Sequence, residues 1–381
     1  MHTHSSWIEV SLANLRHNFR MIFEHVQPGA ALCPIIKCDA YGHGADRCAL
    51  ALQQEGAQWF GVTSVEEGAA LRQAGVTTRI LVLSSFWSGE EDRVVEYDLT
   101  PAVWSRKHVE LLAGAVEKLK AKPVRVHLKV NTGMNRLGAD IKDVPDLCQL
   151  IRSESNIFLE GVFSHLASSE VTDSPTNQTQ IQRFKETLTK MKELGFDPLL
   201  RHMGNSSAIA AHPDSWFNLV RPGLAVYGYF LPFSSVVTGS SDWSRALPVK
   251  PVLTWKARVV QVRDVEARQP VGYSSAYATQ RPTRVAIVSA GYGDGLNRNL
   301  SSRGRMIVRD NYAPVIGNVS MNLTATDVTE IPGVEVGDEV IIIGQTPRCK
   351  VTAWDHATLA STIPYDILCN ISSRLPREYP E

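Results

Sequence analysis

"ALCPIIKCDAYGHGADRCALALQQEG", residues 31–56, runs from an apolar, β-prone segment through a glycine-punctuated turn into a helical pattern. The apolar segment ends abruptly on Lys37. The following helical pattern, residues 46–56, stops at Gly56, a common signal at helix C-termini. A strand that leads directly into a helix is the unit from which parallel sheets are built.

The same unit recurs over the first two-thirds of the chain. Further β-prone runs occupy residues 59–64, 79–85, 99–105, 124–130, 159–167, 199–205 and 218–228. Helical patterns lie between most of these runs, at residues 65–75, 106–121, 144–155 and 180–195, and an amphipathic segment at 11–26 precedes the first run. Eight strands that alternate with helices predict a TIM-like (β/α)8 barrel.

The pattern changes after the eighth run. Residues 234–251 are rich in Ser, Gly and Pro and read as a linker. Short β-patterned runs separated by turns follow at residues 253–265, 283–295, 305–329 and 338–344, and a short helix is predicted at 352–363. We therefore expect two domains, a barrel at residues 1–240 and a mainly β C-terminal domain at residues 241–381.

Composition argues against several classes of function. The chain of 381 residues has 39 basic and 39 acidic side chains, so charge gives no reason to expect a nucleic acid or a membrane surface as a partner. No apolar run approaches the ~18 residues of a membrane span. The start has no secretory signal, and the six cysteines show no CxxC spacing. We expect a cytoplasmic protein with reduced thiols and no metal site.

Lys37 is the first candidate for chemistry. In a β/α barrel the active site lies at the C-terminal ends of the strands. There the amine of Lys37 would be partly desolvated and suited to Schiff-base chemistry, which suggests pyridoxal phosphate. The late runs offer matching parts: Gly204–Ser207 and Gly223 for a phosphate, and Arg221 for the ring nitrogen. Each part alone has an ordinary structural interpretation, such as a surface lysine or an N-cap turn.

The chain resembles the alanine racemase family over nearly its full length. "IIKCDAYGHGA" resembles the lysine signature of that family. Seven further blocks follow in the order of the family: "HLKVNTGMNRLG", "FSHLA", "HMGNSSA", "RPGLAVYG", "GYGDGLNR", "PVIGNVSMNLTATDVT" and "TIPYDILCNISSRLPR". The resemblance implies a pyridoxal-phosphate-dependent isomerase that interconverts L-alanine and D-alanine and supplies D-alanine for peptidoglycan.

The resemblance also implies a two-base mechanism. Lys37 would hold the cofactor and act as one base. Tyr273 would be the other base, supplied by the second subunit of a homodimer with shared active sites. Arg221 would bind the pyridine nitrogen, and because an arginine does not give up its proton, that nitrogen would stay unprotonated. His165 would orient Arg221 and contact the second base.

Further roles follow residue by residue from the resemblance. Cofactor contacts fall on Lys37, Tyr41, His165, Asn205, Ser206, Arg221, Gly223, Leu224 and Tyr365. Arg136 and the backbone N–H of Met321 would bind the substrate. Lys129 is the candidate for carbamylation, which would position Arg136. The lining of the narrow passage to the site would include Glu170, His202, Tyr292, Asp294 and Arg298.

Some positions leave alternatives open. Asn131, Asn322 and Pro364 depart from the commonest alanine racemase pattern and resemble broad-specificity amino-acid racemases of the same fold. Those relatives lack a lysine at the position of Lys129, so alanine remains the leading substrate. A barrel-type decarboxylase would place a carboxylate where Arg221 stands. A pyridoxal-phosphate homeostasis protein would have only the barrel. On pattern alone, Tyr273 and Lys129 could also be ordinary strand residues.

Overall fold

The computed structural model describes residues 4–380, and this part of the chain forms two compact units. The first, which we call the barrel unit, comprises residues 14–40 and 45–250. The second, which we call the β unit, comprises residues 4–13, 41–44 and 251–380. The expected division into domains 1–240 and 241–381 stays a prediction. In the structure, residues 4–13 and 41–44 belong to the same unit as residues 251–380.

The barrel unit is built on eight parallel strands. They follow one another in the sheet in the order β2-β10-β9-β8-β6-β5-β4-β3, and a parallel bridge between Ile35 and Gly61 nearly closes the ring. Their bounds are β2 (Ala31–Leu32), β3 (Trp59–Val62), β4 (Arg79–Val82), β5 (Thr100–Val103), β6 (Val124–Asn131), β8 (Ile157–Phe163), β9 (Leu200–His202) and β10 (Leu219–Val220), with the short β7 (Ala139–Asp140) beside β6. The predicted (β/α)8 barrel is confirmed.

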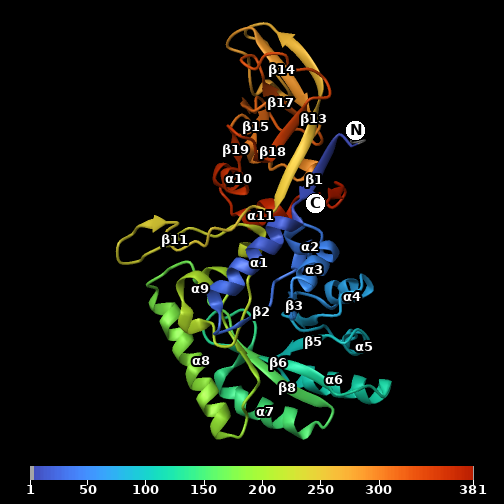
Figure 1. Cartoon of the computed structure of the whole chain (residues 1–381), viewed down its shortest axis with the longest axis vertical. Helices are drawn as coiled ribbons and strands as arrows, with labels where there is room; N and C mark the ends of the chain where they lie inside the picture. The colour runs from blue at the N-terminus through green and yellow to red at the C-terminus, as the bar shows by residue number, and fades with distance from the viewer. Residues whose placement is uncertain (1–3, 381) are drawn as a thin grey trace. The chain divides into compact units, whose positions relative to one another are not determined.

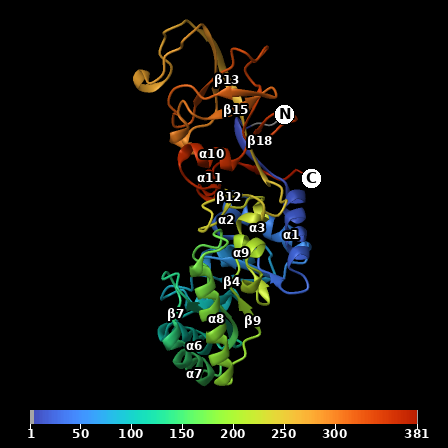
Figure 2. The ribbon, with the colours of Figure 1, turned by 90° about the vertical axis from the view of Figure 1, so that its left-hand side faces the viewer.

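Helices lie around these strands (Figures 1 and 2). They are α1 (Leu12–Val26), α3 (Ala45–Gln54), α4 (Val65–Gln73), α5 (Glu91–Glu96), α6 (Arg106–Leu119), α7 (Val144–Ser153), α8 (Pro175–Glu193) and α9 (Ser206–Ala211). Helix α6 illustrates why they pack there, because Val109, Leu112 and Val116 recur at helical spacing and are buried. Ser64 caps α4 in a capping box with Glu67.

The first βα connection is an unusual helical turn. Helix α2 (Lys37–Gly42) has φ of 51–54° at its four residues 38–41, so it winds to the left. For residues with a side chain this conformation costs roughly 1–2 kcal/mol each. Gly42 and Gly44, which the sequence assigns to a tight turn, have φ of 82° and 88°. The turn therefore stores backbone strain next to Lys37.

The segment expected as a linker contains a small hairpin. Strands β11 (Phe233–Ser234) and β12 (Ser241–Asp242) pair antiparallel within the barrel unit. Asp173 holds the hairpin, because its carboxylate accepts hydrogen bonds from the Ser235 hydroxyl and from the backbone N–H groups of Val236 and Val237. The Ser- and Gly-rich composition of this segment therefore reflects a turn and not an open tether.

The β unit is mainly β, as expected. Its strands are β1 (Ser6–Val10), β13 (Leu253–Val265), β14 (Thr283–Val288), β15 (Arg305–Val308), β16 (Asn311–Pro314), β17 (Thr324–Asp327), β18 (Glu339–Gln345), β19 (Lys350–Val351) and β20 (Arg377–Glu378). Two helices, α10 (Ala353–Ala360) and α11 (Pro364–Cys369), follow β19 (Figure 1). Strand β1 lies between β13 and β20, antiparallel to the first and parallel to the second.

Short 3-10 helices complete the secondary structure. They are η1 (Ile141–Asp143), η2 (Pro213–Ser215), η3 (Leu224–Tyr227), η4 (Tyr273–Ser275), η5 (Tyr292–Asp294) and η6 (Arg298–Leu300). Within residues 4–380, no helix combines the length and the apolar character needed to cross a membrane.

Candidate active site

Lys37 begins the left-handed turn directly after the buried Ile36 and is itself half-buried. Two carboxylates hold the backbone that follows it. Glu67 accepts a hydrogen bond from the N–H of Cys38 at 2.7 Å, and Asp39 accepts one from the N–H of Ala45 at 2.8 Å. The base of the Lys37 side chain is therefore fixed by hydrogen bonds from both sides of the turn.

Basic side chains gather in the barrel unit. Lys129 on β6 is buried, donates to the carbonyl of Leu83 at 3.0 Å and lies 5.3 Å from the ring centre of Phe163. Burial, and then the charges of Arg221, Arg136 and Lys37, lower the pKa of Lys129 to about 7. A neutral amine is therefore substantially populated at neutral pH, and the surroundings as a whole favour an anion.

Arg221 follows β10 and is buried, with only 3% of its surface exposed. Its Nη2 donates to the carbonyls of Ser164 and Met203 at 2.8 and 3.1 Å. Its two terminal nitrogens also meet two imidazoles, at 2.7 Å from Nδ1 of His202 and 3.0 Å from Nδ1 of His165. None of these partners is a carboxylate. Burial lowers the pKa of Arg221 to about 10, so the guanidinium stays charged at neutral pH.

The arginine fixes the state of both imidazoles. A guanidinium only donates hydrogen bonds, so Nδ1 of His165 and Nδ1 of His202 must accept. Burial and the neighbouring cation Arg221 hold the pKa of each of these histidines well below its usual value. Both rings are therefore neutral and carry their proton on Nε2, which makes Nε2 of His165 a hydrogen-bond donor.

Hydrogen-bond donors converge between α9 and η3. The Ser206 hydroxyl lies 2.9 Å from the backbone nitrogen of Gly223 and 3.2 Å from that of Ala225, which brackets Leu224. Asn205 caps α9 through a bond from the N–H of Ala208. Both N–H groups donate to the Ser206 oxygen, so the hydroxyl proton is directed elsewhere and can be donated to an anionic oxygen.

Two tyrosines expected at the phosphate, Tyr41 and Tyr365, both lie in the β unit. Their ring centres are 5.8 Å apart. His43 supports the turn, because its Nδ1 donates to the carbonyl of Tyr41 at 2.9 Å while the ring is fully buried. A side chain at Gly44 would meet the Tyr379 hydroxyl at 1.9 Å.

Tyr273, the expected second base, is 71% exposed in the β unit. It begins η4, after Gly272 with φ of 77° and before Ser274 with φ of 62°. The backbone is held by Asn318, whose side chain donates to the Tyr273 carbonyl at 3.1 Å. The phenol is thus presented on a strained turn whose main chain is anchored.

In the β unit, the segment of Tyr292 and Asp294 is hydrogen-bonded to residues 320–322, which include Met321. The N–H of Tyr292 donates to the carbonyl of Ser320, and the N–H of Gly293 donates to that of Met321. Asn322 donates to both oxygens of Asp294, at 3.3 and 3.2 Å. An aspartate at position 322 would repel Asp294, which gives a physical reason for one departure from the family pattern. Met321 and Arg298 are exposed.

His202 does not lie at a passage to solvent, where the sequence analysis expected it. Its ring is fully buried, stacks on Phe163 with centres 4.7 Å apart, and bonds Arg221. The pattern of the fourth block, "HMGNSSA", did not reveal that this residue of β9 is buried beside Arg221. Glu170 is half-buried, and its carbonyl accepts from the N–H of Ser234. Arg136 is exposed and lines one small pocket with Lys129 and His165.

Sequence reasoning missed several side chains that support the site. Glu67 and His43 hold the turn of Lys37, and His127 and Glu160 lie behind His202. The "HLK" of the second block contains His127, which alternates with Lys129 on β6, but alternation alone does not distinguish a supporting residue from a core residue. Among residues 4–380, no group of three or more His, Cys, Asp or Glu side chains is arranged to hold a metal ion.

Comparison with known proteins identifies the family. Residues 10–230 match the family model "Alanine racemase, N-terminal domain", and residues 252–379 match "Alanine racemase, C-terminal domain". An alanine racemase of Halothermothrix orenii is 37% identical over 380 residues, which cover 99% of this chain and 97% of that protein.

Solved structures agree. An alanine racemase from D-cycloserine-producing Streptomyces lavendulae has a TM-score of 0.91 and 32% identity, covering 100% of this chain and 98% of that one. One from Bartonella henselae with covalently bound pyridoxal phosphate has a TM-score of 0.85 and 28% identity, covering 99% and 100%. This chain therefore belongs to the alanine racemase family of pyridoxal-phosphate-dependent isomerases.

Proposed function

We propose that this enzyme interconverts L-alanine and D-alanine by a two-base mechanism and supplies D-alanine for peptidoglycan. The observation that carries most weight is the environment of Arg221. A buried, permanently protonated donor that contacts two neutral imidazoles and two carbonyls suits a ring nitrogen that accepts a hydrogen bond. A decarboxylase of the barrel type would need a carboxylate there.

The donor set fits pyridoxal phosphate. The Ser206 hydroxyl, which accepts from the N–H groups of Gly223 and Ala225, can donate its own proton to the phosphate. Asn205, Gly223, Leu224, Tyr41 and Tyr365 are the further cofactor contacts that we propose. Lys37 supplies the amine that holds the cofactor. When bound, the cofactor delocalises the negative charge that a substrate carbon acquires when it loses its proton.

The protein side chains then handle the protons. Nζ of Lys37 takes or returns the Cα proton on one face of the substrate, and Oη of Tyr273 does so on the other. His165 donates from Nε2 because Arg221 occupies its Nδ1, so the imidazole can hold the phenol oxygen as its charge changes. Arg136 and the N–H of Met321 bind the substrate carboxylate, and Glu170, Tyr292, Asp294 and Arg298 line the approach.

We further propose that the active unit is a homodimer in which Tyr273 completes the site of the partner. The high exposure of this phenol, on a turn whose backbone is anchored, supports a role at an interface. The scattered cysteines support a cytoplasmic location.

The test is a substrate screen of the purified holoenzyme. L-alanine should give D-alanine faster than any other L-amino acid gives its D-isomer, with no release of CO₂. The second candidate is a broad-specificity racemase, which the residues Asn131, Asn322 and Pro364 favour. Comparable rates with large or basic L-amino acids would establish that candidate, and CO₂ release without D-product would refute racemisation.

A further inference from the structure

A connected series of buried polar side chains leads away from Arg221 inside the barrel unit. His202 accepts from Arg221 through Nδ1, and its Nε2 lies 2.9 Å from Nδ1 of His127. Nε2 of His127 lies 3.6 Å from Oε2 of Glu160. Glu160 in turn forms a two-point ion pair with Arg79, whose guanidinium lies over the ring of Trp59.

Arg221, at one end of this series, determines the direction of the hydrogen bonds in it. Arg221 can only donate, so the proton of His202 is on Nε2 and must point at His127. Nδ1 of His127 therefore accepts, and its own proton is on Nε2, facing Glu160. The Glu160 carboxylate lies 3.6 Å from this Nε2, beyond direct hydrogen-bond distance, but its negative charge favours the same arrangement electrostatically. Burial lowers the pKa of both histidines, which keeps the rings neutral and preserves this arrangement.

Local packing is adapted to these side chains. The pairing of β6 with β8 shifts by one residue between Val126 and His127, so that Glu160 is the extra residue of a bulge. Bulges commonly redirect a side chain beside an active site. A Cβ on Gly161 would lie 2.7 Å from the His127 ring, so only glycine leaves room for it. His127, His202 and Glu160 are at most 5% exposed.

We propose that Glu160 and His127 are positioning residues for the active site: the Glu160 carboxylate stabilises the tautomers that Arg221 imposes on His202 and His127, and thereby helps to hold Arg221 in place as a donor. This inference rests on the proposed function only for its consequence in catalysis. The tautomers themselves are a property of the protein with or without its cofactor.

The experiment uses protein labelled with ¹⁵N in histidine. Long-range ¹H–¹⁵N spectra of the apoprotein and the holoenzyme should show His127 and His202 neutral and protonated on Nε2. In Glu160→Gln, the Arg79 guanidinium attracts the amide oxygen and turns the amide N–H₂ toward His127. In a detectable fraction of molecules the proton of His127 should then move to Nδ1 and that of His202 with it, which places an N–H against Arg221 and breaks their hydrogen bond. We expect kcat to fall by roughly 10-fold, which corresponds to about 1.4 kcal/mol in the activation barrier.

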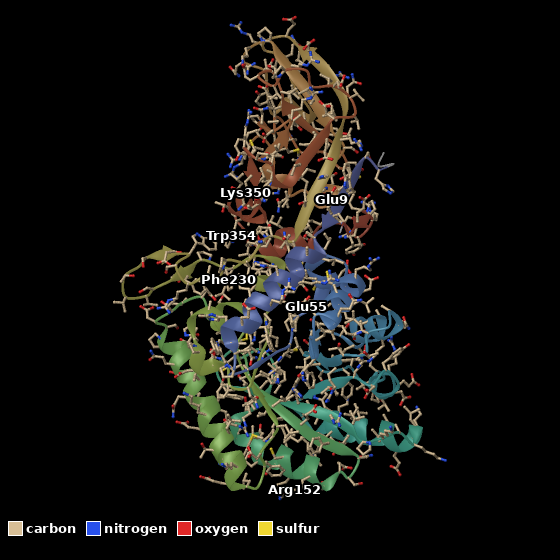
Figure 3. All side chains as sticks on the ribbon, in the orientation of Figure 1. Glu9, Glu55, Arg152, Phe230, Lys350 and Trp354 are labelled. Atoms are coloured by element: carbon tan, nitrogen blue, oxygen red, sulfur yellow. The ribbon has the colours of Figure 1, made fainter. Side chains whose placement is uncertain are left out.

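The matched control is Glu55→Gln. Glu55 is an acceptor of the same type, paired with Arg20 at 3.0 Å beside α1 and remote in sequence from the catalytic residues (Figure 3). This variant should change neither the tautomers nor kcat. If Glu160→Gln does not fold, the wild-type spectra still decide the matter, because a proton on Nδ1 of either histidine overturns the inference.

Two other outcomes are equally decisive. Unchanged tautomers in folded Glu160→Gln would show that the carboxylate does not stabilise them. A tautomer change with unaltered kcat would show that Glu160 does not position Arg221 for catalysis. A wild-type enzyme that fails to racemise alanine would refute the proposed function and leave the tautomer result standing.

Discussion

The carboxylate of Glu67 accepts a hydrogen bond from the backbone N–H of Cys38, the residue that follows Lys37, at 2.7 Å. Its second oxygen accepts from Thr63 and Ser64 at 2.7 and 3.3 Å. One side chain thus ties the start of α4 to the left-handed turn. Because that turn is strained, an external acceptor is what keeps it formed.

Glu67→Gln should therefore destabilise the protein. The amide retains one acceptor oxygen and places a donor where the other stood. Loss of a hydrogen bond to a charged group costs roughly 1.5–3 kcal/mol, measured by urea unfolding. The neighbouring Glu66→Gln weakens an exposed contact with Arg93 and leaves the left-handed turn untouched, so it should change stability by less than about 0.5 kcal/mol. Equal effects of the two substitutions would contradict this role.

Lys37 should be the lysine that carries the cofactor. Borohydride reduction of the holoenzyme followed by peptide mapping should place the label on Lys37, and Lys37→Ala should abolish both the label and racemisation. Lys129 is the informative control, because its lowered pKa makes it the more obvious nucleophile by charge state alone. Label on Lys129 in the wild-type enzyme would overturn the assignment.

Complementation between two inactive variants tests the shared site. Lys37→Ala and Tyr273→Phe should each be inactive, and an equal mixture after subunit exchange should recover about a quarter of the wild-type activity, because half of the dimers in a two-fold assembly have one intact site. Exchange is followed independently by mass spectrometry of differently tagged subunits. Complete exchange without activity would mean that both bases come from one chain.

Carbamylation of Lys129 should depend on pH in a defined direction. Only the neutral amine attacks CO₂, so with ¹³C-bicarbonate a carbamate signal should grow as the pH rises through about 7, the pKa of Lys129. Lys129→Ala should remove the signal. Lys256 is the control: burial alone would lower its pKa, but hydrogen bonds to Glu9 and Glu339 raise it, so no carbamate is expected there. A signal that persists in Lys129→Ala would refute the site.

Asp173 should hold the β11–β12 hairpin down to low pH. Hydrogen bonds from Ser235, Val236 and Val237 lower the pKa of Asp173 to about 2. A lowered carboxyl pKa means that this contribution to stability is complete above the ordinary value and disappears as the pH falls through about 2. Asp173→Asn should increase proteolysis of residues 233–242 at neutral pH, whereas Asp214→Asn on the surface should not. Equal cleavage of both variants would contradict the role.

Much of the architecture could be predicted from the sequence because the spacing of hydrophobic residues distinguishes strands from helices. The eight β-prone runs each overlap a strand of the barrel, and the helices begin near residues such as Ser64 and Ser105 that cap them. Strand β1 was not predicted, since its partners β13 and β20 are more than 240 residues away in sequence and pairing at that distance leaves no local signal. The left-handed turn was missed because Cys38, Asp39 and Ala40 do not favour positive φ; tertiary contacts impose it.

Site residues could be predicted where a charged side chain interrupts an apolar run. They could not be predicted where their contacts depend on the pairing register of two strands. Lys37 and Arg221 stand out because a charged residue ends an apolar run. His127 and Glu160 do not, because their meeting depends on a one-residue shift between β6 and β8 that no local pattern encodes. His202 was assigned to the passage for the same reason, since the inward direction of a residue on a three-residue strand is set by its neighbours.

The position of β1 between β13 and β20 has a consequence for biosynthesis. Because synthesis runs from the N-terminus, this strand leaves the ribosome more than 240 residues before its partners. All strands of the barrel are therefore synthesised before the partners of β1 are. A fragment starting at Pro251 would lack β1, so the edge of β13 that pairs with β1 would be open and β20 would lose its neighbouring strand. Removal of residues 4–13 should therefore damage the sheet formed by residues 253–378, and this sheet cannot be completed before β20 has been synthesised.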